Sequence, residues 1–294
     1  MALVPGDDPE LWSSNPELDV ATRWDRLRHD CNPVLEWCLC VRRSIARAEA
    51  PQLRTNGMKP MDEKHFEILR RHMVEVIGIH TDRLEEELGK AAFAEPILKA
   101  MLRIPRHLFV PEALAQVAYQ DTPLPIGFEK TISQPFICAL MTDLLDPRRH
   151  ETVLEVGTGL GYHTGVLAEL ARYVWSVEII EEFADSARVR LAGLGCANFD
   201  IRIGDGSRGW SEHAPYDKIV VAAAAEKVPE ALLEQLKPTG RLVMPLGEGD
   251  AQQLTAIDKD AAGVIRRRAV IPVRFSRLRR SCDKVGTRRP GHWK

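Results

Sequence analysis

Hydrophobic residues change their spacing near residue 150, and the change separates two kinds of pattern along the chain. Between residues 61 and 89 they recur every three to four positions, which is the repeat of one face of an α-helix. We expect a helix there that stops at Gly89, and a second helix over residues 95–102 that Pro105 ends. The pattern therefore predicts a helical N-terminal extension ahead of residue 150.

Beyond Glu151, short apolar runs typical of β-strands alternate with helical segments. The predicted helices cover residues 162–172, 181–194 and 229–236. The predicted strands cover residues 153–156, 174–179, 199–203, 218–222, 241–245, 253–257 and 264–275. Strands that alternate with helices pair in parallel, whereas the last two have no long helix between them and should pair antiparallel. The sequence therefore predicts a doubly wound α/β fold with a mostly parallel, seven-stranded sheet, helices on both faces and antiparallel closing strands.

The two ends of the chain follow neither pattern. Residues 1–60 are irregular, contain six prolines and offer one helix candidate, over residues 33–50. We interpret them as an appendage of unknown role, ahead of a domain over residues 61–280. Residues 266–294 carry eleven Lys or Arg and one acid. This basic end could hold a nucleic acid or an acidic partner, but we favour a solvated surface strand followed by a flexible tail over residues 281–294.

The composition is that of an ordinary globular protein and excludes several classes. Of 294 residues, 45% are hydrophobic and 28% are charged, and no apolar run is long enough to span a membrane. The first residues lack the basic flank and apolar stretch of a secretory signal, so we expect a cytoplasmic protein. Six cysteines are too few for a disulfide framework and are expected to be free thiols. His29, Cys31, Cys38 and Cys40 lack paired Cys-x-x-Cys spacing, so we expect no metal site.

A glycine-rich turn joins the first predicted strand of the alternating region to the following helix. It contains Gly157, Gly159 and Gly161. An open α/β sheet binds its ligand at such a turn, because glycine lets the backbone come close and the helix N-terminus offers free N–H groups. The turn departs from the dinucleotide fingerprint G-x-G-x-x-G, since its third glycine comes early and Tyr162 stands in the expected place. A pyrophosphate is therefore a less favoured ligand.

Acidic residues lie at the ends of successive predicted strands. Glu155 could attract an ammonium group, Glu178 could accept both hydroxyls of a ribose, and Asp205 could accept from an adenine amine. Each acid has an ordinary alternative. Glu155 could bond the N–H groups of its own turn, Glu178 could cap the next helix, and Asp205 could form a plain Asp-Gly turn. Together with the glycine turn, the ordered set favours S-adenosylmethionine as the ligand.

These residues make the chain resemble class I S-adenosylmethionine-dependent methyltransferases, which have a Rossmann-like fold. A block upstream narrows the resemblance. It contains RIPRHLFVPE at residues 103–112, PLPIG at 123–127 and TISQP at 131–135, and it closely resembles protein-L-isoaspartate O-methyltransferases. The resemblance runs from about residue 61 to residue 278. The TIS-x-P motif after PLPIG is specific to that family, while the glycine turn is common to the whole class.

The resemblance implies roles for individual residues. The serine of the TIS-x-P motif, here Ser133, is the catalytic residue that contacts the substrate carboxylate, and its segment also closes over the cofactor. The alternative for Ser133 is a helix N-cap, since Pro135 suits a first turn and residues 136–145 form a predicted helix. The residues expected to bind the cofactor are Thr131, Ile132, Ser133, Glu155, Gly157, Thr158, Gly159, Gly161, Glu178, Ile179, Gly204, Asp205 and Gly206.

The resemblance also implies the reaction. It is the S-adenosylmethionine-dependent methylation of the free α-carboxylate of L-isoaspartyl and D-aspartyl residues in damaged proteins, with S-adenosyl-L-homocysteine as a product and repair through a succinimide. The alternatives are another acceptor for the same fold, such as a specific peptide or an RNA held by the basic end, and a non-catalytic adaptor. Residues 222–225 are all alanine and lack the polar-Pro-Pro-aromatic motif of base amino-methylation, so a nucleic-acid acceptor is disfavoured.

Two segments depart from the family pattern. Residues 128–130 read Phe-Glu-Lys, where the family tends to have His or Tyr, then Gly and Gln. Residues 276–278 read Ser-Arg-Leu, where the family usually has Val-Pro-Leu. Glu129 could therefore alter the approach of the substrate.

Overall fold

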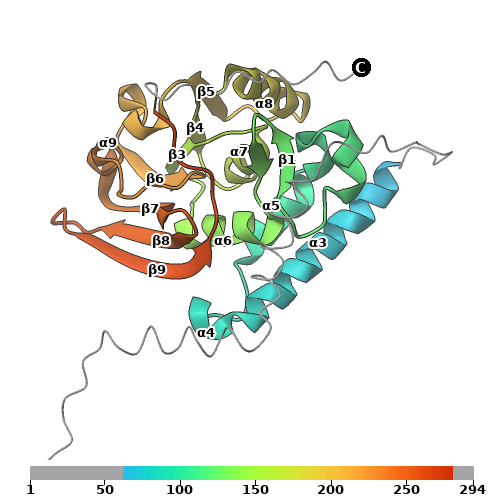
Figure 1. Cartoon of the computed structure of the whole chain (residues 1–294), viewed down its shortest axis with the longest axis horizontal. Coiled ribbons are helices and arrows are strands. Elements are labelled where there is room, and N and C mark those ends of the chain that lie inside the picture. Colours follow the sequence, from blue (N-terminus) through green and yellow to red (C-terminus); the bar gives the residue numbers. More distant parts are fainter. Residues whose placement is uncertain (1–61, 281–294) are drawn as a thin grey trace, which may run out of the picture. The chain divides into compact units, whose positions relative to one another are not determined.

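The computed structural model describes residues 62–280 (Figure 1). The predicted appendage at residues 1–60 and the predicted tail at residues 281–294 lie outside this range. So do the helix candidate over residues 33–50 and the cysteines and histidine at positions 29–40.

The described chain begins with the predicted helical region. It forms α3 (Glu63–Arg83), α4 (Glu85–Leu88) and α5 (Glu95–Arg103). The Asp62 carboxylate caps α3, because it accepts a 3.0 Å hydrogen bond from a backbone N–H of the first turn. Gly89 takes a left-handed φ of 71° and ends α4, which confirms the predicted stop.

A small hairpin and a buried helix precede the main sheet. The elements are the 3₁₀ helices η1 (Arg106–Phe109) and η2 (Glu112–Val117), strands β1 (Leu124–Gly127) and β2 (Lys130–Ile132), and α6 (Pro135–Leu145). Strands β1 and β2 pair antiparallel. Helix α6 is buried along almost its whole length, and its apolar side chains belong to the larger cluster of buried apolar residues.

The main sheet contains the seven predicted strands in the order β5-β4-β3-β6-β7-β8-β9. Their bounds are β3 (Thr152–Val156), β4 (Tyr173–Glu178), β5 (Phe199–Ile203), β6 (Tyr216–Val221), β7 (Leu236–Glu248), β8 (Ala251–Lys259) and β9 (Ile265–Val273). Neighbours from β5 to β7 pair in parallel, while β8 and β9 pair antiparallel, so the predicted fold class is confirmed. The intervening helices are α7 (Tyr162–Ala168), α8 (Glu181–Gly193), η3 (Gly206–Arg208), η4 (Ser211–His213) and α9 (Glu230–Glu234).

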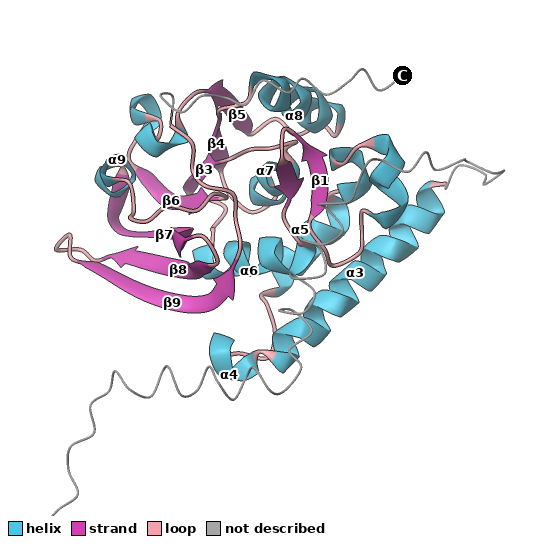
Figure 2. Cartoon of the chain, in the orientation of Figure 1, coloured by secondary structure: helices cyan, strands magenta, loops and turns pink. Residues whose placement is uncertain are grey.

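Helices cover both faces of this sheet (Figure 2), and two clusters of buried apolar side chains, called the two cores, lie on these opposite faces. Alternate residues of a strand point to opposite faces, so in β3 Val153 joins one core and Leu154 the other. The first core packs against helices α3, α5, α6, α7 and α8, and the second packs against α9 and the side chain of Trp210. The larger helical layer therefore covers one face, and a thinner one covers the other.

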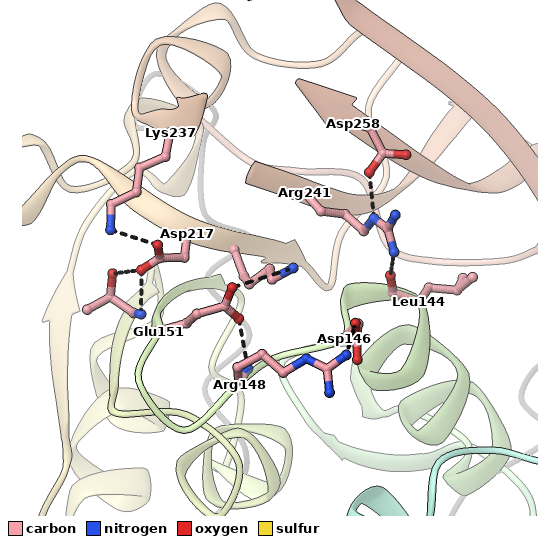
Figure 3. Close-up of polar contacts among 10 residues, drawn as sticks. Leu144, Asp146, Arg148, Glu151, Asp217, Lys237, Arg241 and Asp258 are labelled. Atoms are coloured by element: carbon pink, nitrogen blue, oxygen red, sulfur yellow. Dashed lines mark hydrogen bonds and ion pairs between the residues drawn. The ribbon is translucent and has the colours of Figure 1, made fainter. Parts of the chain in front are cut away.

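Polar side chains fix the amino ends of the central strands (Figure 3). Asp217 of β6 accepts hydrogen bonds from the backbone N–H and the hydroxyl of Thr152 on β3, at 2.8 and 2.9 Å, and from Lys237 on β7 at 2.7 Å. Although burial opposes the effect, these donors hold the pKa of Asp217 below its usual value. Arg241 joins β7 to Asp258 of β8 at 2.6 Å and to a carbonyl at the end of α6 at 3.0 Å. The register of β3, β6 and β7 is thus fixed at the end away from their carboxyl-terminal loops.

Some boundaries differ from the sequence prediction. Helix α7 ends at Ala168 rather than at residue 172, and α9 ends at Glu234 because β7 already begins at Leu236. Leu236 pairs with Tyr216 of β6, so a tertiary contact starts this strand ahead of its apolar run.

Other sequence expectations concern features outside the sheet's centre. Residues 265–273 of the basic end form β9, the outer strand, on which Arg266, Arg267 and Arg268 are exposed.

Cys138 and Cys196 are free thiols. None of the helices in residues 62–280 has the length and apolar character that a bilayer crossing requires. Within the same residues, no cluster of three His, Cys, Asp or Glu side chains is placed to hold a metal ion.

Candidate active site

The carboxyl ends of β3 and β6 form the point where an open α/β sheet binds its ligand. From β3 the chain runs outward through β4 to β5 and then returns to β6 on the other side of β3. Connections therefore leave β3 and β6 in opposite directions, which opens a crevice between their loops. The residues that these loops place at the crevice include Gly157 after β3, Glu178 at the end of β4, Asp205 after β5 and Ala222 after β6.

Glycines of the turn after β3 serve different purposes. Gly157 has a φ of 95°, and a Cβ atom there would contact Ala222 at 3.5 Å, so the turn after β3 passes close to the chain after β6. Gly161 has a φ of 98° and precedes α7. A Cβ on Gly161 would meet the Ala187 side chain of α8 at 3.1 Å, so this glycine lets two helices pack closely.

Glu178 lies at the end of β4 and holds the glycine turn in place. Its Oε2 accepts a 2.8 Å hydrogen bond from the Gly159 N–H, and its Oε1 accepts one of 3.0 Å from the Ile180 N–H. Burial raises the pKa of Glu178 despite these two bonds, which act in the opposite direction. Each carboxylate oxygen keeps a second lone pair, so Glu178 can still accept a ligand hydroxyl. The adjacent Ile179 is partly exposed.

Glu155 lies beneath the turn rather than at its surface. It is fully buried, and its Oε2 accepts hydrogen bonds from the hydroxyls of Thr164 on α7 and Ser176 on β4, at 2.5 and 2.7 Å. The Thr158 hydroxyl lies 2.5 Å from that of Ser176. Within residues 62–280 the Oε1 atom has no hydrogen-bond partner, and the His163 Nδ1 lies 4.0 Å away. The alternative inferred from the sequence, bonds to the N–H groups of its own turn, does not describe these contacts.

The environment of Glu155 changes its ionisation. Burial raises the pKa of Glu155 to about 7, and the two hydroxyl donors only partly oppose this effect. Burial likewise lowers the pKa of the neighbouring His163 to about 4. Both side chains are therefore expected to be uncharged at mildly acidic pH, between these two pKa values.

Asp205 and its flanking glycines shape the loop after β5. The Asp205 Oδ1 accepts from the backbone N–H and the hydroxyl of Ser207, at 3.0 and 2.6 Å, so Asp205 caps η3 as the turn alternative predicts. A Cβ on Gly206 would lie 2.3 Å from the Val156 side chain, which makes glycine necessary there for packing. The Gly204 N–H donates a 2.8 Å bond to the carbonyl at the end of β4 and ties the two strand ends together.

Ser133 is not the N-cap of α6, and that alternative is wrong. The N-cap position is held by Gln134, and the helix begins at Pro135. Asp121, from the segment before β1, caps the helix instead, because its Oδ1 accepts the Phe136 N–H at 2.8 Å and its Oδ2 accepts the Gln134 amide at 2.8 Å. In the described part of the chain the half-buried Ser133 hydroxyl has no hydrogen-bond partner, so it is available to a ligand. Its neighbours Thr131 and Ile132 are exposed and buried, respectively.

Arg106 supports the Ser133 backbone from inside the protein. Its side chain is fully buried, and it donates hydrogen bonds to the carbonyls of Ser133 at 2.6 Å and Ala118 at 2.8 Å. The guanidinium lies over the Tyr162 ring, 4.8 Å from its centroid, at the start of α7. Arg106 thus links the Ser133 loop to the helix that follows the glycine turn. Sequence reasoning missed this role, although Arg106 lies in the block that carries the family resemblance.

The β1–β2 hairpin brings the Ser133 loop onto the glycine turn. A Cβ on Gly159 would contact the Ile126 side chain of β1 at 3.5 Å. The Phe128 ring at the tip of the hairpin packs edge-on against Phe183 of α8, with the ring centroids 5.3 Å apart. Ser133 and the glycine turn are thereby held at the same end of the sheet.

Comparison with known sequences identifies a consistent set of relatives. The family model described as protein-L-isoaspartate(D-aspartate) O-methyltransferase (PCMT) matches residues 81–281. Protein-L-isoaspartate O-methyltransferase 1 of Polaromonas sp. (strain JS666) is 52% identical over 218 residues, which cover 74% of this chain and 92% of the relative. The protein-L-isoaspartate O-methyltransferase of Trichlorobacter lovleyi is 46% identical over 211 residues, which cover 72% of this chain and 93% of the relative.

Solved structures show the same architecture. A protein-L-isoaspartate O-methyltransferase structure superposes with a TM-score of 0.57 and 28% identity, over 74% of this chain and 65% of that one. A putative protein-L-isoaspartate O-methyltransferase from Plasmodium falciparum, in complex with S-adenosyl-L-homocysteine, superposes with a TM-score of 0.58 over 76% of this chain and all of that one. Because its identity is only 22%, this second likeness concerns the fold alone.

Proposed function

This chain belongs to the protein-L-isoaspartate(D-aspartate) O-methyltransferase family, and we propose that it methylates the free α-carboxylate of L-isoaspartyl and D-aspartyl residues with S-adenosylmethionine. One observation carries the proposal. The Ser133 hydroxyl has no partner within the described chain, while its backbone is fixed by the buried Arg106 beside the glycine turn. A free hydroxyl on a fixed backbone is suited to orient an acceptor.

The crevice has the features that S-adenosylmethionine requires. Gly157 and Ala222 lie close together at the strand ends and carry no bulky side chain, and the carboxylate of Glu178 retains lone pairs for two ribose hydroxyls. We propose that Asp205 accepts from the adenine amine and that the other residues of the predicted cofactor site line the same crevice. The cofactor supplies an electrophilic methyl group on a sulfonium.

The side chains of this site have little chemistry to perform beyond orientation. An α-carboxylate with a reference pKa of about 3.9 is already ionised at neutral pH, so no general base has to create the nucleophile. Ser133 donates a hydrogen bond to one carboxylate oxygen and leaves the other free to attack. Arg106 keeps that donor in place through the 2.6 Å bond to the Ser133 carbonyl, and a fixed donor removes orientational freedom from the acceptor.

The product of this step leads to repair without further catalysis. The neighbouring backbone nitrogen attacks the methyl ester, methanol leaves, and the resulting succinimide hydrolyses in part to normal aspartate. The proposed partners are therefore damaged proteins and peptides, and we place them in the cytoplasm. The alanines at residues 222–225 offer neither a polar nor an aromatic group to a flipped nucleic-acid base, which disfavours that acceptor.

Paired peptides test the proposal directly. Two peptides of the same sequence, one with an isoaspartyl and one with an ordinary aspartyl linkage, are incubated with the full chain and methyl-labelled S-adenosylmethionine. We expect base-labile label on the isoaspartyl peptide and background label on its partner. Equal labelling of both peptides, or of neither, would contradict the proposed function.

A further inference from the structure

The two segments that depart from the family pattern line the same cavity. It is open to solvent, has a volume of about 370 Å³, and is called the basic groove below. The residues that line it are Glu129, Lys130, Ser276, Arg277 and Arg279. The first two lie at the tip of the β1–β2 hairpin and the other three follow β9, so only the fold brings the departures together.

The basic groove lies at the proposed active site. The backbone of Arg277 forms a parallel β-bridge with that of Ala224, and the Ala224 N–H donates a 2.9 Å hydrogen bond to the Ser276 carbonyl. The segment after β9 therefore runs beside the chain that leaves the carboxyl end of β6. On the other side of the groove, Lys130 begins β2, and β2 leads directly into Ser133.

The charges that line the groove are mainly positive. It has three cations against the one carboxylate of Glu129. Arg277 is exposed and reaches Glu226 at 3.5 Å. Lys130 and Arg279 are half-buried, and neither forms an ion pair with another side chain in residues 62–280. Such an excess of charge in a concave surface attracts an anion.

The surroundings of Lys130 disfavour its charged form. Burial and the nearby charge of Arg279 lower the pKa of Lys130, and they outweigh the opposite effect of the surrounding carboxylates. An anionic ligand would relieve this repulsion, because an opposite charge favours the ammonium form.

The backbone holds the hairpin tip in a strained conformation. Phe128 and Glu129 have φ values of 49° and 57°, in the left-handed region that favours glycine. The edge-on contact of Phe128 with Phe183 anchors the turn. Residues held in such conformations cluster at functional sites. The turn thus presents Glu129 and Lys130 to the groove from a fixed backbone.

We propose that the basic groove is a subsite for an acidic side chain, Asp or Glu, of the isoaspartyl peptide. The inference rests on the proposed function, because it places the acceptor at Ser133. Ser133 lies three positions after Lys130, which is about 10 Å at roughly 3.3 Å per residue of extended chain. An extended peptide spans the same distance in three residues, and the length of the Lys130 side chain shortens this requirement to about two. An acid two or three positions from the isoaspartyl residue therefore reaches Lys130 and Arg279 while the acceptor carboxylate reaches Ser133.

The test compares isoaspartyl peptides that carry Glu, Gln or Lys at one position, two or three residues to either side of the isoaspartyl residue. We expect kcat/KM of the full chain to rank Glu above Gln and Gln above Lys at one of these positions, with the difference in KM rather than in kcat. Added salt should reduce the difference, since partly exposed charges are screened.

Variants that remove either a cation or the acid of the basic groove test whether the preference for Glu depends on the groove. Lys130→Gln or Arg279→Gln should each lower the Glu-to-Gln ratio of kcat/KM by about threefold to fivefold, the strength of one partly exposed ion pair. Glu129→Gln should raise the ratio, because it removes the only acid that lines the groove. Arg268→Gln is the matched control, since it deletes the same charge from the exposed outer strand β9 and should leave the ratio unchanged. Thermal unfolding confirms that each variant is folded.

Each result decides the inference separately from the proposed function. Equal kcat/KM for the three peptides at every position overturns the subsite, even if only isoaspartyl linkages are methylated. A Glu preference that survives in the Lys130→Gln/Arg279→Gln double variant, or that falls equally in Arg268→Gln, also overturns it. If no peptide is methylated, the proposed function fails, and calorimetric binding of the same peptides then tests the subsite. A preference for the Glu peptide that is lost in Lys130→Gln supports the subsite. Equal binding of the three peptides overturns it. An oligonucleotide that competes better than an acidic peptide, and only with Lys130 present, would assign the groove to nucleic acid instead.

Discussion

Single residues at this site owe their properties to partners from distant parts of the chain. Glu155 could be placed at a strand end from the sequence, but its burial and its bonds to Thr164 and Ser176 depend on how β4 and α7 pack. Ser133 could be identified by its motif, yet the sequence also allowed a cap, because local spacing cannot show that Asp121 already fills that role. Motifs thus predict which residues form the site, and packing decides what each of them does.

The first prediction separates catalysis from capping. Because Asp121 caps α6 and the Ser133 hydroxyl has no partner in residues 62–280, Ser133→Ala should change the free energy of unfolding by less than about 0.5 kcal/mol, the usual range where no specific interaction is lost. Loss of one hydrogen bond to an ionised acceptor should lower kcat/KM for an isoaspartyl peptide by about tenfold to a hundredfold. Asp121→Ala is the control, and it should lower stability by about 1–3 kcal/mol, since it leaves the Phe136 N–H without its acceptor. Near wild-type turnover in folded Ser133→Ala would remove Ser133 from the mechanism.

The second prediction follows from the ionisation of Glu155. Its pKa is raised to about 7 in the folded chain from an ordinary 4.5, so the folded chain binds this proton more tightly than the unfolded chain does. The resulting stability is fully present below about pH 4.5 and is lost as the pH rises through about 7. Glu155→Gln is neutral at every pH, so its stability relative to wild type should improve by about 2 kcal/mol between pH 5.5 and pH 8.

Chemical denaturation of both proteins at the two pH values measures this difference. The buried His163 also titrates, with a pKa lowered to about 4, but it is present in both proteins and its contribution cancels in the comparison. A stability difference that is the same at both pH values would show that Glu155 is not protonated in the folded chain.

Whole elements were more predictable than single residues. The alternation of apolar runs and helices gave the number of strands and their mixed pairing, because buried parallel strands need crossover helices while the closing strands lack them. The boundaries of α9 and β7 were less predictable, since Leu236 joins a strand through its pairing with Tyr216 rather than through its local pattern. The type of an element thus follows from the spacing of its apolar residues, whereas the residues at which it begins and ends depend on tertiary contacts.

The third prediction concerns the amino ends of the strands, opposite the crevice. Asp217→Asn should destabilise the chain by about 1–3 kcal/mol, because it weakens charge-assisted bonds to Lys237 and Thr152. Cofactor affinity at the opposite end of the sheet should stay within about twofold in the folded variant, since distant sites behave independently. Thermal unfolding and calorimetry with S-adenosylmethionine measure the two effects. A large loss of affinity with an unchanged melting temperature would show that this network acts on the crevice.

At the scale of the molecule, the site is assembled from the helical region and the sheet together. Arg106 precedes the hairpin, yet it supports Ser133 and stacks on Tyr162 at the start of α7. The family match likewise begins inside the helical region, at residue 81. The sequence could assign the residues of each region, but it could not show that the two segments departing from the family pattern meet in one groove. That meeting depends on the path of the chain after β9.

The last prediction defines where the catalytic unit begins. Deleting residues 1–60 should leave methyl transfer to an isoaspartyl peptide within about twofold of the full chain, because every residue placed above at the crevice or in the basic groove lies between Arg106 and Arg279. Deleting residues 1–84, which also removes α3, is the matched control. This helix buries Met73 and Ile77, and its Arg70 donates a 3.1 Å bond to Tyr119, so its loss exposes apolar surface worth about 1.5–3 kcal/mol per side chain. Circular dichroism and the peptide assay should therefore find the first truncation folded and active and the second unfolded. A first truncation that fails to fold would place residues 1–60 within the folding unit.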